Sequence, residues 1–104
     1  MIINNAIMHH SRLLIYMMDD PRNIDGLAAV HKLTLVMRDR DVVIDLSLIQ
    51  EELSDQDKTT LLAIEALLRE AGHQLVLRTV SDNAPDTLST LGLTNVLNLE
   101  EACI

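Results

Sequence analysis

A strand–helix–strand pattern between residues 41 and 80 limits the fold more than any other part of the chain. Residues 41–47, DVVIDLS, are short, β-branched and apolar, which is typical of a central strand buried on both faces. Residues 55–71 carry leucine and isoleucine on one side, and predict a strong helix that ends at Gly72. Residues 73–80, HQLVLRTV, predict another strand. Because the connection is a crossover, the two strands are expected to be parallel.

The N-terminal part extends this alternation of strands and helices. Residues 12–18, RLLIYMM, precede the turn-forming DDPRN and predict a buried strand, with residues 1–8 as a weaker partner. Residues 23–40 predict a helix, because apolar side chains recur near helical spacing. The apolar stripe of this helix is expected to include Leu27, Ala28, Leu35 and Val36.

The C-terminal part predicts a short helix, a short strand and a terminal helical turn, at residues 81–92, 94–99 and 100–104. Strands and helices therefore alternate over the whole chain. We expect a single α/β domain, residues 1–104, with a mixed and largely parallel sheet.

Charge limits the partners of this chain. Eight basic and sixteen acidic residues give a formal net charge of -8 at pH 7, so we expect no binding to nucleic acid. Tyr16 is the only aromatic residue, which leaves no set of rings for base stacking. No apolar run reaches the length of a membrane span, and the N-terminus lacks a signal-peptide pattern. A cytoplasmic protein with no direct membrane insertion is expected.

The sequence predicts neither a metal site nor a catalytic constellation. Its histidines lack the four-residue helical spacing of a metal-binding pair: His9, His10, His31 and His73. The three glycines are isolated, so no phosphate-binding loop is expected. No spacing pairs a histidine with Ser47, Ser54 or the single cysteine, Cys103. We therefore expect no enzyme, no metal and no cofactor.

Asp45 is one candidate for a functional side chain. It interrupts an apolar strand near its carboxyl end, the edge at which open α/β sheets bind their ligands. The alternative is structural, and it is favoured: the carboxylate accepts hydrogen bonds from the amides of the following loop.

The start of the long helix is a second candidate. Residues 51–62, EELSDQDKTTLL, place four acidic side chains around Ser54. Ser54 and Asp57, three residues later, resemble a capping box with Asp in place of Glu. The acidic side chains also complement the positive end of the helix. On these grounds, capping explains Ser54 better than regulation does.

From Asp41 onward the chain resembles the STAS family, the sulphate-transporter and anti-sigma-factor-antagonist domains. The resemblance rests on VVIDLS, LLAIEALLREAGHQLVL, LSTLGL and NVLNLEEA, which follow the family's order and spacing. Residues 1–40 match only in the order of their elements. The resemblance implies a mixed sheet of four to five strands with helices mainly on one face, and a binding module without catalysis.

Stand-alone bacterial members of the family act in partner switching, in signal transduction and transcription regulation. A kinase phosphorylates a Ser or Thr at the start of the long helix, preceded by Asp and followed two residues later by Gly. Counting forward from Asp45 places this acceptor at Ser54. Leu53 and Gln56 then stand where the Asp and the Gly belong. Counting back from the apolar face of the helix places the acceptor at Asp55 or Gln56 instead.

Three functions follow as alternatives. The first is a protein-interaction module that binds a switch kinase or anti-sigma-like protein through residues 48–60, with an atypical or lost phosphorylation site. The second is a degenerate STAS domain that serves as a scaffold or a transporter accessory subunit. The third is a small ligand-binding α/β domain. The expected contact residues are Asp45, Ser54, Asp55, Gln56, Asp57, Lys58 and Thr59. A homodimer is a further alternative.

Overall fold

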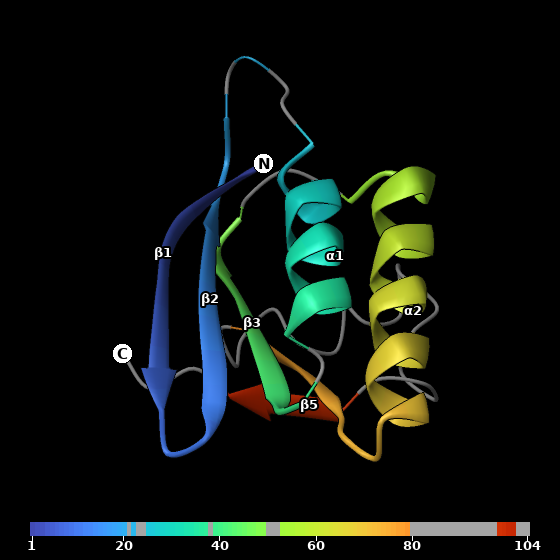
Figure 1. The fold of residues 1–104 in the computed structure, drawn as a ribbon. Coiled ribbons are helices and arrows are strands. Elements are labelled where there is room, and N and C mark those ends of the chain that lie inside the picture. The colour runs from blue at the N-terminus through green and yellow to red at the C-terminus, as the bar shows by residue number, and fades with distance from the viewer. Residues whose placement is uncertain (21, 23–24, 38, 50–52, 80–97, 102–104) are drawn as a thin grey trace.

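The computed structural model describes residues 1–20, 22, 25–37, 39–49, 53–79 and 98–101. These residues form a five-stranded sheet in the order β1-β2-β3-β4-β5, with two helices on one face (Figure 1). The strands are β1 (Ile2–His9), β2 (Arg12–Met18), β3 (Asp41–Leu48), β4 (Leu75–Thr79) and β5 (Asn98–Glu101). The helices are α1 (Gly26–Val36) and α2 (Asp55–Glu70).

The sheet is mixed, as expected. β1 and β2 form an antiparallel hairpin, and every other neighbouring pair of strands is parallel. The hairpin loop consists of His10 and Ser11, whose φ angles are 51° and 66°. Positive φ at both loop positions is the geometry of a type I′ turn, which matches the twist of the two strands.

The parallel strands explain why both helices lie on the same face. α1 connects β2 to β3, and α2 connects β3 to β4. Crossover connections are almost always right-handed, and here strand order follows chain order. Both crossovers are therefore directed to one face of the sheet, and both helices pack there.

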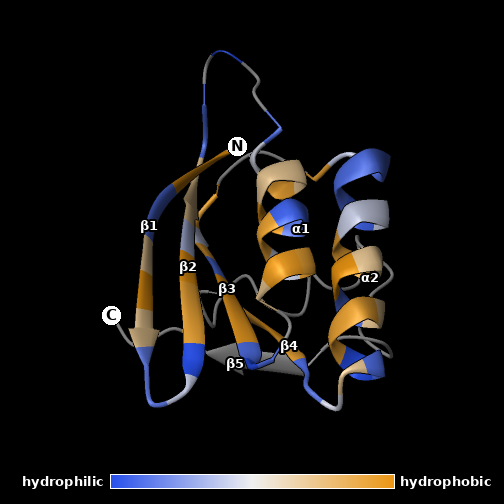
Figure 2. Ribbon diagram, viewed as in Figure 1, coloured by the Kyte–Doolittle hydropathy of each residue, from blue (hydrophilic) through white to orange (hydrophobic). Residues whose placement is uncertain are grey.

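The main core lies between the sheet and the two helices. Alternate residues of each strand point into it, because successive side chains of a strand point to opposite faces. Figure 2 shows apolar segments on β2, β3 and both helices, and the buried hydrophobic residues of the two helices belong to this cluster. The buried residues of this cluster include Leu13, Ile15, Met17, Leu27, Val30, Val42, Ile44, Leu61, Ile64, Leu68 and Leu77.

The other face of the sheet is also buried at its centre. Leu14, Val43 and Val76 form a second apolar cluster there, with Tyr16 packed against it. Val43 is 0% exposed, as are its strand neighbours Val42 and Ile44. The prediction that residues 41–47 form a strand buried on both faces is therefore confirmed.

The predicted helix at residues 23–40 is too long. α1 begins after the N-cap Asp25, whose carboxylate accepts a 3.1 Å hydrogen bond from the amide of Ala28, and it ends at Val36. The predicted apolar stripe was partly wrong, because Leu35 and Val36 are 49% and 83% exposed. Thr34 is buried in their place, and its hydroxyl donates to the carbonyl oxygen of Val30 at 2.8 Å.

The long helix was predicted closely. α2 ends at Glu70, and Gly72 follows with a φ of 82°, the left-handed conformation expected of a glycine after a helix. Leu61, Ile64 and Leu68 are its buried residues. Leu62, which was expected on the apolar face, is exposed.

The C-terminal prediction was only partly correct. β5 begins at Asn98, and it continues through Glu100 and Glu101, where a helical turn was expected. These two residues pair with Arg78 and Thr79 of β4, so hydrogen bonding to the sheet determines their conformation. The helix predicted at residues 81–92 lies outside the described residues.

Candidate functional site

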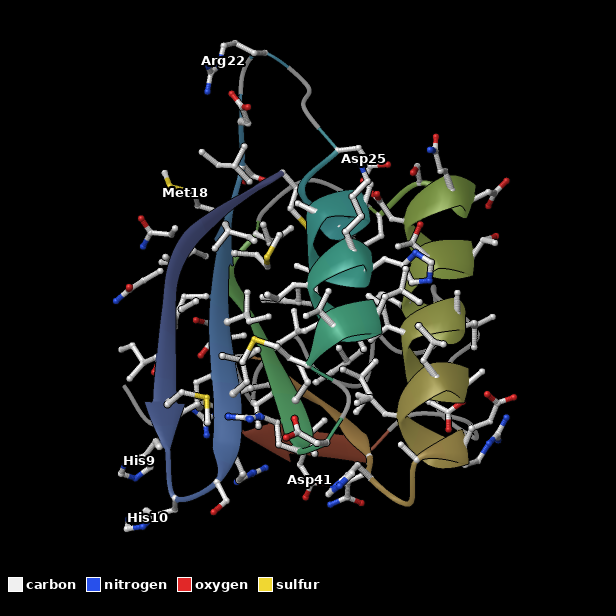
Figure 3. The ribbon with its side chains drawn as sticks, viewed as in Figure 1. His9, His10, Met18, Arg22, Asp25 and Asp41 are labelled. Atoms are coloured by element: carbon white, nitrogen blue, oxygen red, sulfur yellow. The ribbon has the colours of Figure 1, made fainter. Side chains whose placement is uncertain are left out.

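The starts of α1 and α2 lie next to each other at the edge of the sheet where β2 and β3 end (Figures 1 and 3). The side-chain amide of Gln56, in the first turn of α2, donates a 3.1 Å hydrogen bond to Oδ2 of Asp25. Asp25 is the N-cap of α1, so this bond joins the two helix starts. We call the following residues the helix-start site: Asp25, Ser54, Asp55, Gln56 and Asp57.

Ser54 caps α2 by a complete capping box. Its hydroxyl oxygen accepts a 3.0 Å hydrogen bond from the amide of Asp57. In return, the Asp57 carboxylate accepts a 3.1 Å bond from the amide of Ser54. Two amides that have no partner within the helix are thereby satisfied, and the capping box predicted from the sequence is confirmed.

The remaining predicted residues of α2 lie on its first turn. The side chain of Asp55 is fully exposed, and its carboxylate lies 3.8 Å from Nζ of Lys58. The hydroxyl of Thr59 donates to the carbonyl oxygen of Asp55 at 3.0 Å, a bond from a side chain to the backbone of the preceding helical turn. The structure thus brings Asp55, Gln56, Asp57 and Lys58 together with Ser54 on one exposed turn.

Asp45 is separated from the helix-start site by the sheet itself. It shares its side of β3 with Val43, whereas Val42, Ile44 and Leu46 face the helices. Asp45 is only 5% exposed, and its Oδ1 accepts a 2.8 Å hydrogen bond from the amide of Ser47 as well as the Ser47 hydroxyl. Pairing with β2 is irregular at this point. Asp45 therefore satisfies a backbone amide near the end of β3. This supports its structural role, although the amide belongs to the strand itself and not to the following loop as predicted.

The chemistry of the helix-start site is that of an acidic protein surface. An isolated helix start offers unpaired amides to an anion. Here Ser54 and Asp25 already accept hydrogen bonds from amides of their own helices. The acidic side chains that surround them favour a basic partner over a phosphate group.

Asp20 is a buried carboxylate that was not among the residues predicted from the sequence. It follows β2, is 4% exposed, and accepts a 2.9 Å hydrogen bond from the amide of Arg22 through Oδ1. Its other carboxylate oxygen is buried without a hydrogen bond. The signal in the sequence was the Asp-Pro step of DDPRN, since Asp before a turn commonly binds the amide two residues later.

The hydrogen bond from the Arg22 amide lowers the pKa of Asp20 below its usual value of 3.8. A carboxylate with a lowered pKa stabilises the fold above its unfolded pKa, and this contribution is lost as the pH falls through the folded pKa. We expect Asp20→Asn to be less stable than the wild type at pH 7. Urea unfolding at a series of pH values should show the difference shrinking below about pH 4.

Asp55→Asn is the control, because it removes one acidic charge at a fully exposed position. Because the interactions of the Asp55 carboxylate with the start of α2 and with Lys58 are exposed to solvent, this variant should lower the urea midpoint at pH 7 only slightly. A stability difference between Asp20→Asn and the wild type that stays constant down to pH 2 would contradict the role given to the Asp20 carboxylate.

The capping role of Ser54 predicts a stability loss that depends on its hydroxyl. Ser54→Ala should lower the free energy of unfolding by about 0.5–2 kcal/mol, measured by urea denaturation. Ser54→Thr keeps the hydroxyl and should lose much less. Equal midpoints for Ser54→Ala and the wild type would show that the capping box contributes nothing to stability.

In the part of the chain that the structure describes, no helix is long and apolar enough to cross a membrane. The His, Cys, Asp and Glu side chains described there form no group of three or more that could hold a metal ion.

Comparison with known proteins supports the fold alone. The chain is similar to the NMR structure of the protein TM1081, with a TM-score of 0.74 and 11% sequence identity. The similarity covers 93% of this chain and 79% of that one. No family model and no curated protein matches the chain. At such low identity, the shared feature is a small α/β architecture.

Proposed function

We propose that the chain is a non-catalytic protein-interaction module of the STAS type, and that it binds its partner through residues 48–60. The partner would be an anti-sigma-like kinase or another switch protein. The proposal combines the sequence resemblance with a mixed sheet that carries its described helices on one face.

The observation that carries the proposal is the position of Ser54. Family members place their phosphoacceptor at the start of the long helix, and Ser54 is the exposed N-cap of α2. Asp55 follows it with a fully exposed carboxylate. A hydroxyl and a carboxylate are thus presented side by side to a partner.

The capping box supports an atypical or lost phosphorylation site. A phosphate on Ser54 would add roughly -1.5 to -2 charge beside the Asp57 carboxylate, whose Oδ2 lies 3.1 Å from the amide of Ser54. Asp55 is the next residue, so repulsion would act from two sides. The permanent charge of these carboxylates could instead take the place of a phosphate in partner binding.

Affinity capture from the source cell, followed by identification of the bound proteins, tests this proposal. Because the helix-start site is acidic, the partner surface should be basic and the association should weaken with added salt. Recovery of a kinase or switch protein at low salt is expected. If capture at low salt yields neither, the partner-switching proposal fails.

A charge-reversal variant localises the contact, and we expect Asp55→Lys to weaken partner binding at least tenfold. A tenfold loss corresponds to about 1.4 kcal/mol. Glu70→Lys is the matched control, because it makes the same charge change at an exposed residue at the other end of α2. Binding constants measured by calorimetry should separate the two variants, and equal losses would mean that only net charge matters.

The engagement of the Ser54 hydroxyl also favours a second function, a degenerate STAS domain that acts as a scaffold or transporter accessory. This alternative predicts no phosphate on Ser54, Thr59 or Thr60 in protein purified from its native cell. Phosphopeptide mass spectrometry tests it directly. A phosphate at any of these hydroxyls would exclude the degenerate form and support a working switch.

A further inference from the structure

β1 is an outer strand of the sheet, with β2 on one side and no described strand on the other (Figure 1). A two-residue loop makes His9 and Arg12 a hydrogen-bonded pair, and pairs alternate from there along the hairpin. The backbone groups of Ala6 and Met8 therefore point away from β2. The Ala6 amide donates to Oδ1 of its neighbour Asn5 at 2.9 Å, in agreement with this direction.

Among the described residues, this edge carries few of the features that usually prevent strands from pairing between molecules. Outer strands are commonly protected by lysine, proline, inward-pointing charges, β-bulges or a covering element, and β1 has one irregularity, between Ile3 and Asn5. The sequence of β1, IINNAIMH, contains no Lys, Arg, Asp, Glu or Pro, and residues 4–9 are exposed. Ile7 and Met8 are 43% and 45% exposed. An irregularity between Ile3 and Asn5 leaves residues 5–9 as the regular stretch.

Charge indicates that a second copy of the chain can occupy this edge. The chain has a net charge of -8, so most contacts between copies bring acidic surfaces together. The first acidic residue is Asp19, so a β1-to-β1 contact joins the copies along a segment without carboxylates. Antiparallel pairing of identical strands also forms a closed two-fold dimer.

We propose that β1 pairs antiparallel with β1 of a second copy, with the two-fold axis at Ile7. Ile7 is the centre of the regular stretch 5–9, so each Ile7 lies opposite its own copy. Ala6 then exchanges backbone hydrogen bonds with Met8 of the other copy, and the Ala6 amide gives up its bond to the Asn5 side chain for one to the Met8 carbonyl oxygen. Asn5 lies opposite His9 of the other copy, and no like charges face each other.

The same register extends an apolar row that the structure already contains. Ile7 pairs with Leu14, Leu14 with Val43, and Val43 with Val76, all on the face opposite the helices. Placing Ile7 of the second copy beside Ile7 continues this row across the dimer. Side chains in such directly opposed pairs contact each other and stabilise the sheet.

Sedimentation velocity tests the dimer. A contact along residues 5–9 lies at the low end of interface size, so a reversible dimer is expected whose population rises with protein concentration. Ile7→Lys places two like charges opposite each other and should give a monomer. Leu62→Lys makes the same change at an exposed leucine of α2 and should leave the dimer intact. A monomeric wild type, or a dimeric Ile7→Lys with native circular dichroism, overturns the proposal.

Cysteine cross-linking tests the register in a Cys103→Ser background. Ile7→Cys places two cysteines directly opposite each other, within disulfide distance, and air oxidation with copper phenanthroline should cross-link them. Met8→Cys is the control, because the two copies of Met8 would lie diagonally, roughly 7–8 Å apart. Efficient cross-linking through Ile7→Cys alone supports the register. Equal or preferential cross-linking of Met8→Cys overturns it.

Discussion

Gly26→Ala is expected to destabilise the protein by roughly 2–4 kcal/mol, although alanine is the better helix former. A Cβ at Gly26 would lie 2.5 Å from the carbonyl oxygen of Met1 and 2.8 Å from Cα of Ile2. Both obstacles are backbone atoms, so no side chain can rotate to make room. The Gly26 amide also donates a 2.7 Å hydrogen bond to that carbonyl oxygen, which joins the start of β1 to the start of α1.

A comparison of Gly26→Ala with Gly72→Ala by urea unfolding distinguishes the cost of a steric clash from the cost of backbone strain. Gly72 has a φ of 82°, but a Cβ there would meet nothing within 4 Å. Gly72→Ala should therefore cost only the strain of a left-handed alanine, about 1–2 kcal/mol. If Gly26→Ala were as stable as the wild type, β1 and α1 could not be packed as closely as the structure has them.

Val43→Asp is expected to unfold the protein or to remove roughly 4 kcal/mol of its stability. Val43 is fully buried on the sheet face opposite the helices. A carboxylate there would be buried beside the apolar side chains of Leu14 and Val76, and a typical domain has only about 5–15 kcal/mol of stability to lose. Thermal unfolding followed by circular dichroism would show the loss.

Two variants make the Val43 result interpretable. Val43→Ala removes apolar volume without adding charge and should cost about 2 kcal/mol, which remains measurable if Val43→Asp does not fold. Asn5→Asp adds a carboxylate at an exposed position on the same face and should change stability by less than about 0.5 kcal/mol. A stable Val43→Asp protein would show that the centre of this face is open to water.

Local sequence patterns predicted most of the fold. The capping box of Ser54 and Asp57 and the central strand were both predicted correctly, because each depends on residues close together in the chain. The end of α1 was not, since Leu35 and Val36 continue an apolar pattern that the folded protein leaves exposed. The pattern shows which residues are apolar, but the rotation of the helix on the sheet decides which of them are buried, and it turns Thr34 inward together with Leu27 and Val30.

In the candidate site, too, the local features were predicted from the sequence and the spatial arrangement was not. The sequence predicted that residues 54–59 begin a helix and present acidic and hydroxyl side chains. It also grouped Asp45 with them, whereas the pleat of β3 turns that carboxylate to the other face of the sheet. A change of one position along a strand moves a side chain to the opposite face, so proximity in sequence says little about proximity in space.

The sequence by itself determined the order of strands and helices from β1 to β4, the parallel connections and the cap of α2, because these follow from periodicity and from contacts within a few residues. Only the tertiary structure decided that Gln56 hydrogen-bonds to Asp25, that the backbone of Met1 packs against Gly26, and that β1 lies at the sheet edge. Each of these depends on residues about 25 or more positions apart, or on the order of the strands. Such contacts form only when the packing of the whole sheet and both helices brings the segments together.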